Sequence, residues 1–297
     1  MTVAESERRQ VSLVLGSGGA RGHAHLGVIR AIEERGLEIR NLAGTSMGAV
    51  IGGIHAAGAL ETYTEWAYRL EVGDVVKLLD FSFRGSVFKG ERVYDVLGEL
   101  IGHRKIEDLG IGFTAVATDI DAQREIWLNS GPLFQAVRAS SAVPGVFEPV
   151  RVNGRTLVDG GLVNPIPIAP TLNDDTDLTI AVNLNAMSGH RRQRPSPPRV
   201  EPTEEDQAYR SRIKRFIGEL FGNSERATER LPASRLMVRS IDVMQGAIAR
   251  LKLAAYVPDV VVEIPREAAG FFEFNRAEEL AALGYEATLE ALREFDA

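Results

Sequence analysis

Gly44-Thr45-Ser46-Met47-Gly48 joins an apolar strand pattern, Ile39 to Thr45, to a helix pattern rich in small residues. A Gly-x-Ser-x-Gly turn between strand and helix is typical of a nucleophile elbow, which presents the serine hydroxyl at a sharp bend. Flanking glycines let neighbouring backbones pass closely, and the free N–H groups of the helix favour negative charge nearby. We therefore expect Ser46 to be a nucleophile supported by Gly44 and Gly48. The alternative is a tight turn with an incidental serine.

A second glycine-rich turn, Gly16-Ser17-Gly18-Gly19-Ala20-Arg21-Gly22, lies between an apolar strand pattern at 11–15 and a helix pattern from Ala24 to Arg35. Backbone N–H groups at such a turn form a cradle for negative charge. Arg21 stands where a dinucleotide fingerprint needs its third glycine, and the Gly-Lys-Ser/Thr of a Walker A loop is absent. The neighbouring serine elbow favours an oxyanion hole. Its expected members are Gly18, Gly19, Ala20 and Arg21, with Arg21 bracing the turn or adding positive field and with Gly16 and Gly22 in support.

The triplet Asp159-Gly160-Gly161 follows a segment typical of a β-hairpin, with Asn153-Gly154 at its turn. Glycines after the aspartate allow another backbone to come close. We expect a functional Asp159 supported by Gly160 and Gly161. A turn aspartate that caps its own backbone is the alternative.

In this order, the segments 18–22, 44–48 and 159–161 resemble the motifs of the patatin-like phospholipases, and Ser140-Ser141-Ala142-Val143-Pro144 is similar to the family's Ser-x-x-x-Pro block. The resemblance covers about residues 11–185. Residues 240–265 are similar, less specifically, to the bacterial branch related to the neuropathy target esterase catalytic domain. The resemblance implies a three-layer α/β/α fold with a mostly parallel central sheet and a catalytic Ser46–Asp159 dyad without histidine. It also implies hydrolysis of phospholipid or lysophospholipid esters without a metal or cofactor.

The histidine positions agree with a dyad. An α/β-hydrolase triad needs serine, acid and histidine in chain order, and only His190, in a polar and proline-bearing stretch, follows Asp159. His23 and His25 lie beside the glycine turn, where local packing is a simpler interpretation than a catalytic role. We interpret Asp119 as a structural cap.

Composition is that of a soluble globular protein, with 44% hydrophobic and 25% charged residues among 297. The absence of cysteine excludes disulfides and a thiol nucleophile, and it favours a reducing compartment. Residues 41–60 carry no charge, but their glycines and the elbow favour a buried strand and helix over a membrane span. Residues 1–10 show no apolar leader. We expect a cytoplasmic protein, with peripheral membrane contact left open, no nucleic-acid partner and no assignment of oligomeric state.

Three expectations concern domain organisation. Residues 1–10 are expected to be disordered, and residues 11–297 to form a single catalytic domain. A basic, proline-containing insertion or lid is expected at about 187–235, where the net charge is +4 against −11 elsewhere. Such a segment suits contact with anionic headgroups, or it is a solvated surface excursion.

Alternating strand and helix patterns predict a sheet covered on both faces. Strands are expected at 39–45, 113–118, 125–128, 178–183 and 260–264, and helices at 91–101, 132–140 and 277–295. A further helix is predicted from apolar residues at alternating spacings of four and three. We expect this stripe to pack on the core, with a lipid-facing role as the alternative; its members are Met237, Ile241, Met244, Ile248, Leu251 and Ala255.

Two functions from different classes remain. The first is a serine acyl hydrolase of lipid esters that acts through an acyl-enzyme. The second is a non-catalytic module that binds an anion or lipid headgroup in the glycine turns. The presence of both Ser46 and Asp159 favours the enzyme, because a binding module needs no nucleophile.

Overall fold

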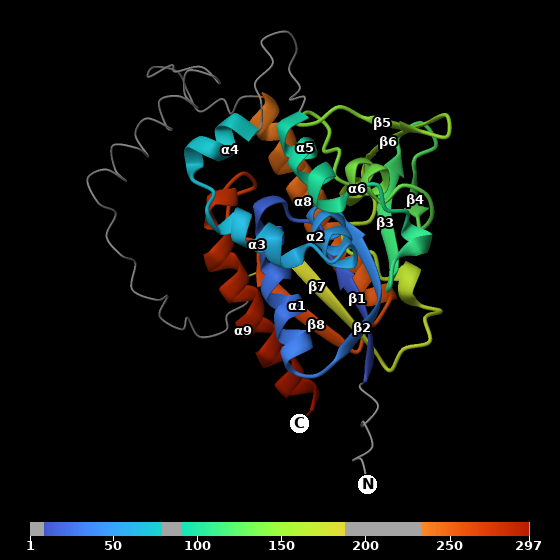
Figure 1. Ribbon diagram of the computed structural model, residues 1–297, viewed down its shortest axis with the longest axis vertical. Helices are drawn as coiled ribbons and strands as arrows, with labels where there is room; N and C mark the ends of the chain where they lie inside the picture. Colours follow the sequence, from blue (N-terminus) through green and yellow to red (C-terminus); the bar gives the residue numbers. More distant parts are fainter. Residues whose placement is uncertain (1–8, 79–90, 188–232, 297) are drawn as a thin grey trace, which may run out of the picture. The chain divides into compact units, whose positions relative to one another are not determined.

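The computed structural model describes residues 9–78, 91–187 and 233–296 (Figure 1). The chain divides into two compact units, one of residues 1–187 with 241–297 and one of residues 188–240. His190 and nearly all of the predicted insertion or lid lie outside the described residues, as do residues 1–8 of the predicted disordered terminus. The single-domain organisation stays a prediction.

The core of the first unit is one eight-stranded, mostly parallel sheet. Its parallel strands run side by side in the order β3 (Gly112–Asp119), β2 (Glu38–Thr45), β1 (Gln10–Leu15), β7 (Leu178–Ala186) and β8 (Val260–Pro265). Antiparallel pairings join β4 (Arg124–Leu128) and β6 (Arg155–Asp159) to β3, and β5 (Val150–Val152) to β6. Asn153 and Gly154 both have positive φ, as the tight turn between β5 and β6 requires.

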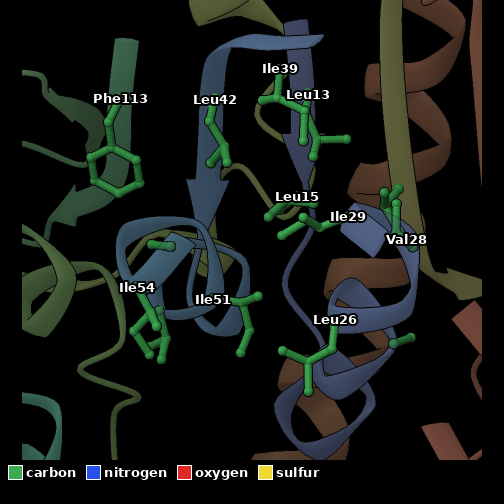
Figure 2. Close-up of a cluster of buried hydrophobic side chains, with 14 of the residues drawn as sticks. Leu13, Leu15, Leu26, Val28, Ile29, Ile39, Leu42, Ile51, Ile54 and Phe113 are labelled. Atoms are coloured by element: carbon green, nitrogen blue, oxygen red, sulfur yellow. The ribbon is translucent and has the colours of Figure 1, made fainter. Parts of the chain in front are cut away.

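Both faces of this sheet are buried, which explains the nearly continuous apolar runs in β1 and β7. On one face, Leu13 and Leu15 of β1 pack in the large core with α1 (Ala24–Glu34), α2 (Met47–Ala56) and α9 (Ala277–Phe295). Figure 2 shows side chains of α1 and α2 in this cluster with those of β1 and β2. On the other face, Val14 packs with Ala249 of α8 (Ala233–Ala255). The three-layer α/β/α fold is therefore confirmed.

The remaining helices are short and connect or cover the strands. They are α3 (Leu60–Tyr68), α4 (Val72–Leu78), α5 (Glu91–Ile101) and α6 (Leu133–Ser140), with 3₁₀ turns η1 (Gly19–His23), η2 (Ile106–Asp108), η3 (Gly160–Leu162), η4 (Ala169–Thr171) and η5 (Phe274–Arg276). The five strands and three helices predicted by residue range are all present, with ends shifted by three residues at most. The uncharged stretch 41–60 forms the end of β2 and α2, as expected. Across the described ranges, no helix is long and apolar enough to cross a membrane.

The predicted orientation of α8 is wrong. Met244 and Leu251 of the predicted stripe are exposed, and only Ile241 is fully buried. The inward face instead carries Gln245 and Ala249 beside Ile241. Polar side chains of α8 bind other residues on this side: Asp242 pairs with Arg21, and Gln245 accepts a hydrogen bond from Ser17. Hydrophobic periodicity alone does not predict such contacts.

Candidate active site

Ser46 lies between β2 and α2 with φ 57° and ψ −124°, a conformation that costs a non-glycine residue on the order of 1–3 kcal/mol. The flanking glycines allow this bend. A Cβ atom on Gly44 would lie 2.5 Å from the Gly48 carbonyl oxygen, and one on Gly48 would lie 2.0 Å from the Leu15 carbonyl oxygen. A Cβ on Gly22 would similarly lie 2.3 Å from the Met47 side chain, so η1 rests directly on the elbow.

Ser140 at the end of α6 holds the elbow in place. The Ser46 N–H donates to Ser140 Oγ at 3.0 Å, and the Ser140 hydroxyl donates to the Val116 carbonyl at 2.6 Å. Ser140 is fully buried. It belongs to the Ser-x-x-x-Pro block but was not among the predicted site residues, because its role depends on a contact with a distant strand.

Strand β3 brings Asp159 to Ser46. The β4 hairpin partner occupies one edge of β3 along the whole of Ala115–Asp119. Strands β2 and β6 must therefore share the other edge: Thr45 of β2 pairs with Val116, and Asp159 of β6 pairs with the next residue, Ala117. The last residue of β2 and the last residue of β6 thus meet at consecutive positions of one strand. Two motifs that are far apart in the sequence become neighbours in this way.

The Asp159 carboxylate is buried, with 2% of the residue exposed. Its Oδ1 accepts the Gly161 N–H at 2.7 Å, whereas Oδ2 has no hydrogen-bond partner among the described residues. Burial raises the pKa of Asp159 from 3.8 to about 6, and the neighbouring Ser46 hydroxyl and the Gly161 N–H oppose this rise. The alternative interpretation is thus correct in part, because Oδ1 does cap its own turn. Gly160 is needed for close packing, since its Cβ would lie 2.1 Å from the Val116 carbonyl oxygen.

The glycine turn follows β1, the strand beside β2. The Gly18 and Gly19 N–H groups have no backbone hydrogen-bond acceptor in the described structure, and Gly19 has φ +56°. The Ala20 N–H, by contrast, donates to the Phe271 carbonyl at 3.0 Å. The expectation that Ala20 contributes to an oxyanion hole is therefore corrected: its donor is already used to hold the turn against the β8–α9 connection. A Cβ on Gly16 would lie 2.6 Å from the Val182 carbonyl oxygen, so this glycine allows close packing on β7.

Arg21 is buried and has the contacts of a brace. Its Nε donates to the Gly18 carbonyl at 3.1 Å, and its Nη1 donates to the Arg266 carbonyl at 2.9 Å. Its Nη2 forms a salt bridge with Asp242 of α8 at 2.5 Å and a long hydrogen bond to Asn185 at 3.5 Å. Since all three guanidinium nitrogens have partners, Arg21 serves the turn through contacts rather than as a free charge.

Helix α8 also reaches this site through Gln245, which is 4% exposed. The Ser17 hydroxyl donates to Gln245 Oε1 at 3.3 Å, and the Asn185 amide donates to the Ser17 carbonyl at 3.1 Å. Sequence reasoning missed Asp242, Gln245 and Asn185. No local signal distinguishes them, because polar residues in a helix or at a strand end are usually solvated.

The histidines beside the turn are packing residues. His25 Nε2 donates to the Gly16 carbonyl at 2.9 Å, and His23 Nε2 lies 3.1 Å from the Tyr63 hydroxyl. Burial lowers the pKa of each imidazole to about 4, so both are neutral near pH 7. Asp119 is the expected cap, since its Oδ1 accepts the Ala122 N–H at 3.0 Å. Among the described side chains, no group of three or more His, Asp or Glu could hold a metal ion.

Comparisons with known proteins identify the family of this chain. The family model described as patatin-like phospholipase matches residues 13–172. An NTE family protein of Mycobacterium bovis is 36% identical, and the match covers all of this chain and 95% of that protein. A lysophospholipase, nte1, of Emericella nidulans is 31% identical to this chain. The match covers 62% of this chain but only 12% of that much longer protein.

A solved structure shares the fold. The crystal structure of VipD from Legionella pneumophila matches with a TM-score of 0.55 at 16% identity, over 97% of this chain and 67% of VipD. The family match covers more than half of the chain, and the Mycobacterium relative spans all of it. The chain is a lipid hydrolase that belongs to the patatin-like phospholipase family.

Proposed function

We propose that this protein cleaves carboxylic esters of phospholipids or lysophospholipids with Ser46 as nucleophile and Asp159 as general base. One observation carries the proposal: a buried carboxylate oxygen, Asp159 Oδ2, has no described hydrogen-bond partner beside a serine held at a strained elbow. An unpaired buried acceptor is costly in a fold unless it has a task. A pKa near 6 leaves Asp159 ionised at neutral pH yet more basic than an ordinary aspartate, which suits a base working near that pH.

The first half of the reaction forms an acyl-enzyme. Asp159 Oδ2 takes the hydroxyl proton as Ser46 Oγ bonds to the ester carbonyl carbon. The Gly18 and Gly19 N–H groups donate to the tetrahedral oxyanion; losing one such donor typically costs on the order of 100-fold in rate. Asp159 then gives its proton to the departing alcohol oxygen as the carbon–oxygen bond breaks.

The second half reverses these roles with water. Asp159 removes a proton from water, the hydroxide bonds to the acyl carbon, and the same two N–H groups hold the oxyanion. The ester bond to Ser46 breaks, Oγ recovers the proton from Asp159, and the fatty acid leaves. No histidine is required, because the carboxylate acts directly on Ser46.

The substrate class rests on the relatives. The fungal relatives are named lysophospholipases, and we extend that substrate to this chain, with intact phospholipids as the alternative. We also propose peripheral contact with a lipid surface through the outward face of α8. Val243, Met244 and Leu251 are 58%, 47% and 69% exposed there, and no Asp or Glu occurs between positions 243 and 258. An apolar face without carboxylates suits an interfacial helix. A cytoplasmic location stays a prediction.

Labelling with a fluorophosphonate probe, followed by peptide mapping and hydrolysis of lysophosphatidylcholine, tests the nucleophile. We expect label on Ser46 in the wild type, none in Ser46→Ala, and at least 100-fold slower labelling in Asp159→Asn. Ser130→Ala, at an exposed serine, is the matched control and should label normally. A folded wild type that neither labels nor hydrolyses in the presence of lipid micelles would favour the binding module instead.

A further inference from the structure

The inward face of α8 carries two polar side chains, Asp242 and Gln245, that contact residues of the glycine turn. Asp242 bridges two guanidinium groups, with Oδ1 on Arg21 and Oδ2 3.1 Å from Arg266 Nη2. Gln245, three residues further along, accepts a hydrogen bond from Ser17. Both residues lie outside the segment that the family model matches.

The contact of Arg21 with the glycine turn determines the direction in which the Gly19 N–H bond points. Arg21 Nε binds the Gly18 carbonyl, which belongs to the same peptide unit as the Gly19 N–H. In a planar trans peptide the C=O and N–H bonds point in opposite directions. Holding the carbonyl on the Arg21 side therefore turns the Gly19 N–H away from Arg21. Because Arg21 is 2% exposed, its charge depends on Asp242 for compensation, and loss of that carboxylate would free Arg21 to move.

Gln245 acts on the other half of the site. Its Nε2 lies only 2.4 Å from the Cβ that a side chain at Gly161 would carry, and that same point is 2.8 Å from Ser17 Oγ and 2.9 Å from Asp159 Oδ1. The Gln245 amide thus fills the corner between Ser17 of the glycine turn and the turn that follows Asp159. A side chain at position 161 would therefore displace the Gln245 amide.

We propose that Asp242 and Gln245 make α8 a positioning element of the active site, with Asp242 orienting the Gly19 N–H through Arg21 and Gln245 fixing Ser17 against the turn after Asp159. The expected effect on kcat rests on the proposed function, whereas the contacts between α8 and the glycine turn do not. We therefore expect different effects when the two residues are changed. A change at Asp242 should weaken stabilisation of the transition state, and a change at Gln245 should alter the environment of the base, Asp159.

Asp242→Asn tests the first link by two measurements. Hydrogen–deuterium exchange of peptides covering residues 16–23 should become at least tenfold faster, with exchange in β1 and β2 unchanged. The kcat should fall about 10- to 100-fold with KM within twofold, because the oxyanion donor acts only in the transition state. The pH midpoint of kcat should stay the same. Asp242→Glu, which keeps the charge, should recover part of the loss, and Asp121→Asn, at an exposed aspartate, is the control.

Gln245→Glu tests the second link, because a carboxylate in this corner disfavours ionisation of Asp159. We expect the pH midpoint of kcat to rise by about one unit. Tyr94, which also interacts with Asp159, stays neutral throughout, since burial raises its pKa to about 12. Gln245→Met should lower kcat without moving the midpoint. Gln135→Glu, which adds the same charge at an exposed helix position, should change neither.

Three results would overturn the proposal. One is a rate of hydrogen–deuterium exchange at residues 16–23 of Asp242→Asn that equals the wild-type rate. If Asp242→Asn does not fold, unchanged exchange in both Asp242→Glu and Arg21→Lys has the same meaning. Another is faster exchange throughout the protein, which indicates a purely structural role. The third is a pH midpoint in Gln245→Glu equal to that of the wild type. If the wild type proves inactive, the exchange measurement still decides the link to Arg21, and only the proposed function fails.

Discussion

Helices α2 and α8 pack against the same sheet but serve the site in opposite ways. In α2 every residue from Gly48 to Ile54 is buried, and the helix acts through its backbone, because it begins directly after Ser46. In α8 the inward side chains at 242 and 245 are polar, while Val243, Met244 and Leu251 face outward. A helix that contacts the sheet through its backbone needs small residues, as in α2. A helix that acts through its side chains needs polar residues at buried positions, as in α8. Neither helix therefore shows an ordinary amphipathic pattern.

This difference has a physical basis in how close the two helices come to the sheet. The α2 backbone touches the end of β1 through Gly48, leaving no space for a side chain. Gly246 of α8 has only the end of the Arg250 side chain within 4 Å of an added Cβ, at 3.8 Å.

The largest effect is expected in α2. In Gly48→Ala the new methyl group would lie 2.0 Å from the Leu15 carbonyl oxygen and 2.9 Å from that of Gly16, both backbone atoms that cannot rotate away. We expect unfolding free energy to fall by about 3 kcal/mol or more and activity to be lost, because the elbow must shift. Urea denaturation monitored by circular dichroism measures this. A midpoint close to that of the wild type would show that α2 does not depend on backbone contact.

The second effect concerns Asp159, which lies between Ser46 at the start of α2 and Gln245 of α8. Its folded pKa is about 6 against an ordinary value of 3.8, so the folded state binds this proton more tightly than the unfolded state does. Stability from Asp159 is therefore full below pH 4 and is lost as pH rises through 6. Asp159→Asn should be more stable than wild type by about 1–3 kcal/mol at pH 8 while losing activity.

Denaturant titrations of wild type and Asp159→Asn at pH 4, 6 and 8 measure this difference, which should shrink as pH falls. His23 and His25, whose pKa values are lowered, destabilise both proteins in acid as pH falls from 6.5 toward 4, so their contribution cancels. In the wild type, kcat should rise with pH about a midpoint near 6. A stability difference independent of pH would contradict the assignment of a raised pKa.

The third change, Gly246→Ala, should alter the unfolding free energy in the opposite direction to Gly48→Ala. Gly246→Ala places a methyl group in the interior of α8 without a clash, and alanine is favoured over glycine in a helix. We expect the unfolding free energy to rise by about 0.5–1 kcal/mol, measured by the same urea titration. Hydrolysis should be unchanged. Destabilisation by more than about 1 kcal/mol would indicate that α8, like α2, approaches its neighbours through the backbone.

The smallest effect is expected at the C-terminal end of α8. Lys252 Nζ lies 3.4 Å from Glu125 Oε2, and both side chains are about a quarter exposed. Such pairs contribute about 1 kcal/mol or less, and salt screens them. Lys252→Met should therefore shift the melting temperature slightly, and less at 1 M salt than at 0.05 M. A shift of several degrees that persists in high salt would make this end of α8 as important as Asp242 and Gln245.

Local motifs were sufficient to predict most of the helices and strands by residue range. The elbow, the glycine turn and the hairpin at Asn153-Gly154 lie on the strand ends where their patterns place them. The sequence did not reveal that the Ala20 N–H is already bonded, because its acceptor is the carbonyl of Phe271, far along the chain. The inward rotation of α8 was likewise not predictable, since Ile241 is the only member of the expected stripe that is fully buried.

Glycine content, apolar runs and turn residues act on the backbone within a few residues, so the amino-acid sequence alone specifies the strand–turn–helix units. Which of these units meet depends on the tertiary structure. Asp159 reaches Ser46 only because β2 ends opposite Val116 and β6 ends opposite Ala117 on the same edge of β3. Strand register is set by hydrogen bonds between distant segments, and the contacts of Arg21 and Ser17 with α8 depend on it. These contacts follow from packing of the complete fold, so they have no counterpart in any local pattern.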